Sequence, residues 1–427
     1  MEKFINILKQ NKEISAWKIN SVSKKSCELF YVSDKLETNR ATDVTKYRIT
    51  IYVDKDGKRG SSTFSAFDYM SEDELNKKIS ENVYAASFAM NPYYDIPDKE
   101  ASTIETCKSN LQEKPFNEII SDVVDAVFAA NVYKEGYLSA TEFFLNEITE
   151  RIVNSNCVDV TSKTCSGNIE LIPSWEKDGH EVELYHMINF ESFEPKAITE
   201  EVNEKLLLAK ARFEAKELEH KEGIKVILQD EEVSDILDYF IGELSYSAKY
   251  IKSNKYELGE NVQGENVSGD ILNIKLVPYY ENAFSSRPFD SDGVILKEVE
   301  VIKDGVAINR HGSYQYGYYL GEKHPTGILP IKVVSEGTKS FAEMSKEPYI
   351  RCVQFSGIQV ESNSGFFGGE VRLGFYFDGE KEIPVTGFSI SGDLNVSRGT
   401  FVLSKETVTK SSYHGPKYME LKDMTIL

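Results

Sequence analysis

Apolar residues between positions 230 and 250 recur at the spacing of an amphipathic helix. They are Val233, Ile236, Leu237, Phe240, Ile241 and Leu244. This spacing places all of them on one face of a helix, so that face is expected to be buried. Ser234 is a candidate N-cap residue, and Gly242 and Ser245 are small enough to let another backbone or a ligand approach. We expect this single helix to organise the C-terminal part of the chain.

The N-terminal part of the chain mixes strand and helix patterns. Alternating apolar positions predict strands over residues 28–33 and 47–53, and Asp56-Gly57 favours a tight hairpin turn into residues 62–67. Ser71 and Glu74 form a capping box that opens a helix to about residue 89. Further helices are expected over residues 1–12, 116–131 and 198–219, and further strands over residues 137–144, 148–154, 158–165, 169–174 and 182–190.

Strand patterns dominate the C-terminal part, apart from the helix described above. The expected strands cover residues 224–228, 271–277, 294–303, 314–320, 328–334, 350–355, 369–378, 388–392 and 401–403. Tyr314, Tyr316 and Tyr318 alternate along one of these strands, so their rings would share one face. They are either an aromatic wall that contacts an extended peptide or ordinary sheet packing, and the sequence leaves both open.

These elements predict an α+β protein with two small N-terminal α+β subdomains and a larger β-rich C-terminal domain. The expected ranges are residues 1–100, 115–222 and 223–427, with a polar connection after the first of them. A chain of 427 residues suits two to three domains.

Composition limits the kinds of partner, metal site and cellular location that we expect for this chain. The 49 basic and 69 acidic residues give a net charge of −20, which opposes phosphate backbones, so we expect no nucleic-acid partner. Five widely spaced cysteines without a C-x-x-C pair argue against a disulfide framework or a zinc ribbon. The polar N-terminus is unlike a signal peptide, and no apolar run reaches the ~18 residues of a membrane span. A cytoplasmic protein without a membrane partner is the simplest expectation.

The helix between residues 230 and 250 contains no histidine. Its mid-helix carboxylates are Asp238 and Glu243, which lie five residues apart and are expected to point to different faces. Zinc normally requires three convergent protein ligands, and the nearest histidines, His220 and His311, lie outside the helix. We therefore expect no metal and no catalytic residue on this chain.

Three segments of the C-terminal part resemble the third domain of the TldD/PmbA family, also called modulators of DNA gyrase. They are DYFIGELSYSAKYIKSNKYELGENV, RPFDSDGVILKEVEVIKDGVA and GYYLGEKHPTG. The stretch from Cys352 to Leu394 is similar to the closing sheet of that family. The segment RIVNSNCVDVTSKT resembles its middle domain, although the family usually has glycine where Cys157 stands. A cysteine there would be strained if the turn kept a positive φ.

In catalytic members of the family, the equivalent helix carries H-E-x-x-x-H, with two zinc-binding histidines and a general-base glutamate. Because these histidines are absent here, the chain resembles the PmbA/TldE branch, the partner subunit. The resemblance implies a degenerate active-site helix, whose candidate site residues are Asp238, Tyr239, Gly242, Glu243 and Tyr246.

The implied function is that of a non-metal-binding, non-catalytic subunit of a cytoplasmic metallopeptidase that acts on unfolded or small peptides. Zinc is then expected on a TldD-type catalytic partner. Two alternatives remain: a stand-alone homodimer that binds peptides without cleaving them, and an active hydrolase with an unrelated site.

Overall fold

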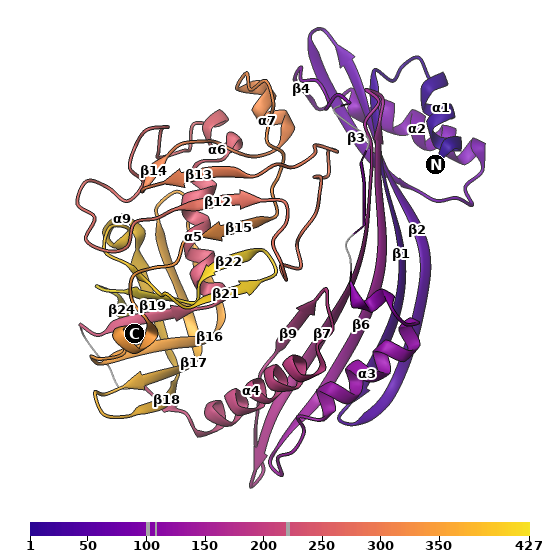
Figure 1. The fold of residues 1–427 in the computed structure, drawn as a ribbon. Coiled ribbons are helices and arrows are strands. Elements are labelled where there is room, and N and C mark those ends of the chain that lie inside the picture. The colour runs from indigo at the N-terminus through magenta and orange to yellow at the C-terminus, as the bar shows by residue number, and fades with distance from the viewer. Residues whose placement is uncertain (100–102, 107–108, 219–222) are drawn as a thin grey trace.

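A computed structural model describes residues 1–99, 103–106, 109–218 and 223–427 (Figure 1). The protein is a mixed α+β structure, as its sequence predicts. The helices of the described residues are α1 (Glu2–Gln10), α2 (Glu72–Ala86), η1 (Asn110–Gln112), α3 (Phe116–Phe128), α4 (Pro195–Glu214), α5 (Glu231–Glu243), α6 (Tyr246–Tyr250), α7 (Tyr314–Tyr319), α8 (Phe341–Met344) and α9 (Leu394–Ser397). None of the helices in these ranges is long and apolar enough to cross a membrane.

One sheet of nine described strands runs through the N-terminal half. Its order is β4-β3-β2-β1-β6-β7-β5, and β8 and β9 also pair with β7. Its strands are β1 (Ala16–Val32), β2 (Lys35–Lys55), β3 (Lys58–Ala66), β4 (Met90–Pro92), β5 (Thr103–Thr106), β6 (Gly136–Asn154), β7 (Asp159–Lys177), β8 (His180–Glu183) and β9 (His186–Phe190). β1 pairs with β2 on one side and with β6 on the other. The division into subdomains of residues 1–100 and 115–222 stays a prediction. In the structure, one continuous sheet joins these two ranges.

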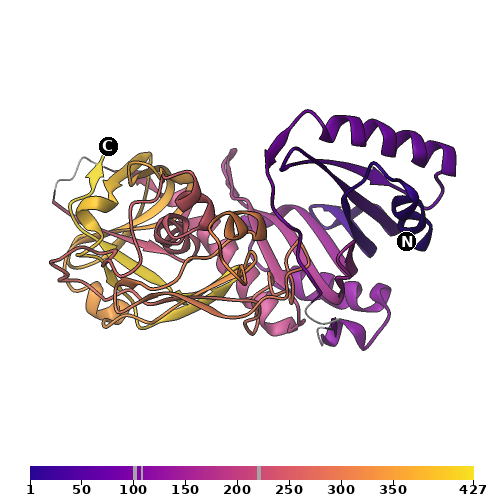
Figure 2. The same cartoon turned by 90° about the horizontal axis from the view of Figure 1, so that it is seen from above.

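The strands of this sheet are longer than the sequence predicts. Residues 137–144 and 148–154 were expected as two strands but form the single strand β6, and β7 likewise unites two predicted strands. The reason is that α3 and α4 cover only one face of the sheet (Figure 1). On that face, their apolar residues pack against Phe143 and Ile169 in a shared buried cluster. Figure 2 shows the same sheet from above. The other face carries polar residues such as Asn146, which interrupt the apolar alternation without ending the strand.

This second face of the sheet is turned toward the C-terminal half. The side chain of Asn20 donates a hydrogen bond to the carbonyl of Ser291 at 3.0 Å, and Lys18 forms an ion pair with Asp292. Beside these polar contacts, Ile152, Val158 and Val160 form a buried apolar cluster with Phe289, and these four residues come from both halves. At the tip of the same loop, a Cβ on Gly293 would lie 2.8 Å from Val158, so this close approach requires glycine.

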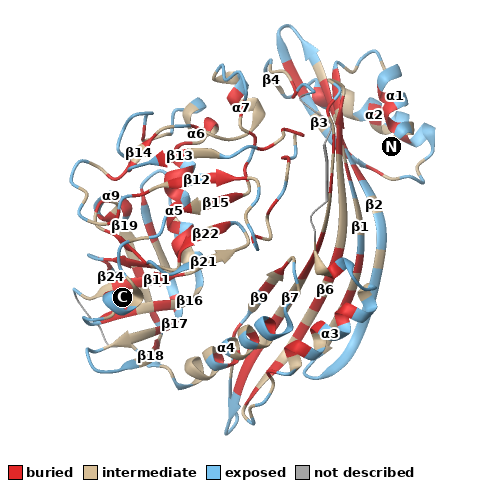
Figure 3. Ribbon diagram, in the orientation of Figure 1, coloured by how far each residue is buried: buried red, intermediate tan, exposed pale blue. Residues whose placement is uncertain are grey.

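The C-terminal half packs two sheets around α5 (Figures 1 and 3). The larger sheet has the order β10-β18-β17-β16-β11-β23-β20, with β19 and β24 beside it, and the smaller has the order β14-β13-β12-β15-β22-β21. The larger sheet contains β10 (Lys216–Glu217), β11 (Lys225–Gln229), β16 (Tyr349–Val360), β17 (Phe366–Phe377), β18 (Glu382–Thr386), β19 (Phe388–Asp393), β20 (Val402–Leu403), β23 (Tyr418–Leu421) and β24 (Thr425–Ile426). The smaller contains β12 (Ile274–Val277), β13 (Val299–Lys303), β14 (Val306–Ala307), β15 (Ile331–Val334), β21 (Thr407–Lys410) and β22 (Tyr413–Pro416).

The predicted strand over residues 314–320 is wrong, because Tyr314–Tyr319 forms the short helix α7. Helical spacing lets Gln315 donate a hydrogen bond to the hydroxyl of Tyr319 at 3.1 Å, and it brings Tyr316 and Tyr319 against Tyr250 of α6. These aromatic contacts between α6 and α7 are long-range, so the alternating tyrosines did not reveal them.

The predicted single helix over residues 230–250 is two helices. α5 begins at Glu231, with Asp230 rather than Ser234 at its N-cap position, and it ends at Glu243. Ser245 then caps α6, because its hydroxyl accepts a hydrogen bond from the amide of Ala248 at 3.1 Å. The small side chain that was expected to admit a ligand therefore starts a new helix.

The turn between β6 and β7 keeps a left-handed backbone at a residue other than glycine. Cys157 has φ +68°, and its side chain is exposed. An L-residue in this conformation brings its Cβ close to a carbonyl oxygen, which costs about 1–2 kcal/mol.

Replacing Cys157 with glycine should therefore stabilise the protein. We expect Cys157→Gly to raise the free energy of unfolding by about 0.5–1 kcal/mol, since the relief of strain exceeds the added chain entropy of glycine. Cys157→Ala keeps the Cβ and should change it by no more than a few tenths. Urea denaturation measures both, and equal effects of the two substitutions would contradict the strain argument.

Candidate functional site

α5 is buried on most of its circumference. Its exposed residues form a narrow stripe, spaced three or four apart, that consists of Glu231, Asp235, Asp238 and Gly242. Tyr239 and Glu243 lie on the buried side together with the apolar residues of the helix. The two mid-helix carboxylates therefore point to different faces, and each meets a different lysine.

Asp238 forms an ion pair with Lys332 of β15. The side chain of Asp238 is 59% exposed, whereas that of Lys332 is 5% exposed. The Lys332 ammonium also donates a hydrogen bond to the carbonyl of Ser234 at 2.7 Å. Burial lowers the pKa of Lys332, and the nearby charges of Asp238 and Asp235 oppose this shift. Lys332 thus places a tethered positive charge against the exposed stripe of α5.

Tyr239 and Glu243 share a second lysine. The ammonium of Lys255 lies 2.7 Å from the hydroxyl oxygen of Tyr239, and the backbone amide of Lys255 donates to Glu243 at 2.6 Å. Burial raises the pKa of Tyr239 and of Glu243, although the amide and charge of Lys255 favour the ionised carboxylate. These contacts fix the segment after α6 onto the buried side of α5.

Tyr246 and His311 hold the break between α5 and α6. The imidazole Nε2 of His311 donates a hydrogen bond to the carbonyl of Ile241 at 2.9 Å, and the amide of Tyr246 donates to the carbonyl of His311 at 2.7 Å. Burial lowers the pKa of His311, so its imidazole is neutral near pH 7. Tyr246 is buried, and His311 acts here as a cap for the last turn of α5.

These residues do not fit a zinc ion. Asp238 is paired with Lys332, Glu243 accepts a hydrogen bond from Lys255, and His311 is hydrogen-bonded to a carbonyl. Across the described ranges, no three histidine, cysteine, aspartate or glutamate side chains lie close enough together to hold a metal. His220 lies outside the described residues.

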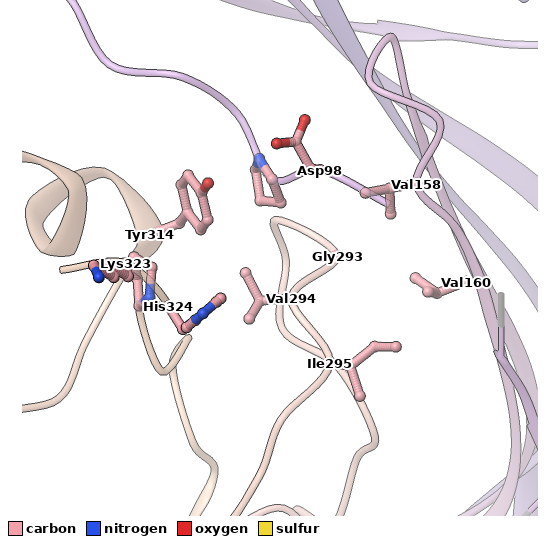
Figure 4. A pocket seen from close by; sticks show the side chains of 11 residues that line it. Asp98, Val158, Val160, Gly293, Val294, Ile295, Tyr314, Lys323 and His324 are labelled. Atoms are coloured by element: carbon pink, nitrogen blue, oxygen red, sulfur yellow. The ribbon is translucent and has the colours of Figure 1, made fainter. Parts of the chain in front are cut away.

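The three tyrosines of the predicted peptide-contact strand do not share one face. Tyr318 packs edge-on against Tyr93, and Tyr316 packs against Tyr250. Tyr314 instead lines a pocket of about 190 Å³ at the junction of the two halves, together with Asp98, Val158, Val294 and His324 (Figure 4). α7 therefore connects the two halves, and whether any of its tyrosines contacts a peptide stays a prediction.

The sequence reasoning missed Lys332, Lys255 and His311. The sequence did mark Lys332 as unusual, because it is the only charged residue in the run Ile-Lys-Val-Val of a predicted strand. A lysine at such a position must find a partner or reach water. Lys255 and His311 carried no such signal, since both lie in polar loops.

The first turn of α5 contains a second perturbed carboxylate. Burial raises the pKa of Glu232 to about 8, and the neighbouring charges of Glu231, Asp230 and Asp235 add to this shift. In the unfolded chain the same group would titrate near 4.3. Between these two values the folded state holds a proton that the unfolded state has lost, so stability falls as pH rises through this range.

Glu232→Gln should remove this pH-dependent loss of stability. We expect the variant to match the unaltered protein near pH 4.5 and to exceed its free energy of unfolding by about 2 kcal/mol at pH 8, a discounted value because Glu232 is only partly buried. Glu72→Gln, an exposed first-turn residue of α2, is the matched control and should leave the pH profile unchanged. Urea denaturation across pH measures both, and parallel profiles for Glu232→Gln and the unaltered protein would contradict the expectation.

The ion pair between Lys332 and Asp238 allows a prediction about the stability of Lys332 variants. Lys332→Met keeps the apolar stem, and the exposed Asp238 can turn to water, so the free energy of unfolding should change by less than about 1 kcal/mol. Lys332→Glu instead buries a like charge beside Asp238 and should cost more than about 3 kcal/mol. A loss for Lys332→Met as large as that for Lys332→Glu in urea denaturation would mean that the pair itself stabilises the fold.

The sequence and the fold of this chain are similar to those of several known proteins. Residues 221–427 match the family described as the PmbA/TldA metallopeptidase C-terminal domain. The metalloprotease PmbA of Escherichia coli O157:H7 is 27% identical over 194 residues, which cover 44% of this chain and 42% of that protein. The sequence match thus spans less than half the length of this curated relative.

Three solved structures share the fold over nearly their whole length. A protein named as a modulator of a DNA gyrase from Thermotoga maritima has a TM-score of 0.78 at 20% identity, with all of both chains covered. TldE from Thermococcus kodakarensis has a TM-score of 0.77 at 13% identity, covering 100% of this chain and 99% of that chain. A protein named as a modulator of DNA gyrase from Bacteroides thetaiotaomicron has a TM-score of 0.80 at 16% identity, covering 100% and 98%. Residues 221–427 therefore belong to the PmbA/TldA metallopeptidase C-terminal domain family, and the whole chain shares the fold of these three proteins.

Proposed function

We propose that this chain is the non-metal-binding subunit of a two-subunit peptidase, and that a TldD-type partner supplies the zinc and the general base. The chain itself would perform no chemistry. It would complete an enclosed cavity and help to select unfolded or small peptides, in the cytoplasm. The observation that carries the proposal is that α5 has no imidazole and that both of its mid-helix carboxylates already have partners, the ammonium of Lys332 for Asp238 and the backbone amide of Lys255 for Glu243.

Lys332 supports this proposal because its ammonium lies where a cation bound by Asp238 would lie. A zinc site needs deprotonated ligands that converge on an open position. At Asp238, the adjacent positive charge is the ammonium of Lys332, and it is anchored to the carbonyl of Ser234 at 2.7 Å. A divalent ion approaching Asp238 would be repelled by this buried ammonium.

The exposed stripe of α5 suits contact with another chain. Gly242 lies on this stripe, and a Cβ built on it meets no atom within 4 Å. Glycine inside a helix costs about 1 kcal/mol relative to alanine. The helix therefore keeps a destabilising residue where its surface is open, which fits a site that a partner or a peptide backbone approaches closely.

Reconstitution with the catalytic partner tests the proposal. This chain and the TldD-type protein of the same host are purified separately and mixed, and each sample is assayed for bound zinc and for cleavage of casein. We expect co-purification of the two chains, zinc on the partner only, and strong cleavage only in the mixture. Stoichiometric zinc on this chain alone, or chelator-sensitive cleavage by this chain alone, would refute the proposal.

Two substitutions at Gly242 sharpen the experiment. Gly242→Ala should stabilise this chain by about 0.5–1 kcal/mol, because a methyl group fits the open space of the isolated chain, and it should impair cleavage by the mixture much less than a long side chain does. Gly242→Arg keeps the helix but fills the stripe with a long side chain, and it should reduce cleavage by the mixture at least tenfold while the chain remains folded. Full activity of the Gly242→Arg mixture would mean that this stripe of α5 faces neither partner nor peptide.

A further inference from the structure

A second concave site lies between the two halves, at the N-terminal end of α5. It is a cleft of about 560 Å³, within the range of small-molecule sites. One wall comes from the C-terminal half and contains residues 229–232 and residues 353–356 of β16. The other wall comes from the N-terminal half and contains residues 183–187 around the start of β9, with Lys205 and Leu208 of α4 (Figure 1). The cleft is thus built by both halves, away from the pocket of Figure 4.

The wall at the start of α5 contains a carboxylate that is incompletely paired. The Oδ1 atom of Asp230 is buried and accepts no hydrogen bond from the described residues, while its Oδ2 accepts one from Gln229 at 3.3 Å. Glu231 and Glu232 lie beside it and line the same cleft. A buried acceptor without a donor is unfavourable, so a ligand that brings a charged N–H group to Asp230 would be bound there.

Cations line other parts of the same cleft. Arg372 of β17 is exposed at the cleft and forms no ion pair with the described residues. Its planar guanidinium suits the two oxygens of a carboxylate. Lys410 of β21 also lines the cleft, but its ammonium already lies 3.8 Å from Glu201, so Arg372 is the available anion-binding group.

Apolar side chains complete the walls. Phe355 and Val353 of β16 lie on one side, and Leu184, Met187 and Leu208 lie on the other. Met187 is 41% exposed, so it offers apolar surface to a ligand in the cleft. The cleft therefore combines a site for an amine, a site for a carboxylate and apolar walls.

We propose that this cleft binds a short peptide with both ends free, its ammonium at Asp230 and its carboxylate at Arg372. Such a ligand carries the two opposite charges and the apolar side chains that the cleft matches. The proposal rests on the proposed function, which already names small peptides, and adds to it a separate cleft that recognises both free ends of a peptide. Its test needs neither a partner nor cleavage, so the two proposals can fail separately.

Binding of one tripeptide in four forms tests the proposal on the purified full chain. The probe is Ala-Phe-Ala with free ends, N-acetylated, C-amidated, or blocked at both ends, and calorimetry measures each dissociation constant. We expect the free form to bind, and each single block to weaken binding about tenfold or more because a charge-assisted hydrogen bond is lost. Equal affinities for the free and the doubly blocked forms, or no binding of the free form at millimolar concentration, would overturn the proposal.

Two substitutions assign the ends of the peptide. Asp230→Asn keeps the size and shape of the side chain and removes only its charge, and it should abolish the effect of N-acetylation but not that of C-amidation. Arg372→Gln should do the converse. The matched controls are Asp304→Asn, at a turn with φ +50°, and Arg48→Gln, at an exposed strand position outside the cleft; both should leave all four affinities unchanged. If Asp230→Asn and Arg372→Gln also leave them unchanged, the peptide does not bind in this cleft.

Discussion

The burial of α5 between two sheets is the constraint on which the C-terminal half depends. The larger sheet contributes Val226 and Phe367 to the same core as the helix, and the smaller sheet contributes Ile274 and Val334. A helix packed on opposite sides leaves only a narrow stripe for solvent, so polar side chains outside that stripe must find partners within the protein. Tyr239 and Glu243 are such side chains, and their contacts with Lys255 follow from this constraint.

The ion pair between Asp238 and Lys332 also limits the chemistry of the helix. A buried ammonium next to a carboxylate satisfies its charge, so the carboxylate no longer gains by binding a metal ion. At Lys332 the surrounding protein even lowers the pKa of the ammonium, yet the ion pair with Asp238 and the hydrogen bond to Ser234 hold it in place. The polar groups of this helix are thus used to hold the fold together.

The two halves are joined by contacts that neither half would form alone. The loop before Val294 inserts Phe289 into an apolar cluster with the long strands, and the buried carboxylate of Asp290 holds this loop by accepting hydrogen bonds from the amides of Asp292, Val294 and Ile328 at 2.9–3.1 Å. α7 adds a second junction, where the hydroxyl of Tyr319 donates to the carbonyl of Pro92 at 2.7 Å. Both the small pocket of Figure 4 and the larger cleft at Asp230 lie where the halves meet, so the shape of each site depends on this docking.

The sequence by itself determined the fold class, the family and the features that depend on neighbours in the chain. The hairpin turn at Asp56-Gly57, the capping box at Ser71 and the buried face of α5 were all predicted, because turn geometry, helix capping and helical periodicity are local. Only the tertiary structure decided the helical state of the tyrosines in α7, the length of the strands and the partners of α5. Lys332 meets Asp238 across 94 positions of sequence, and no local rule relates two such residues. Which charge lies beside which carboxylate depends on how the sheets pack, and for this helix that packing sets what the carboxylates can bind.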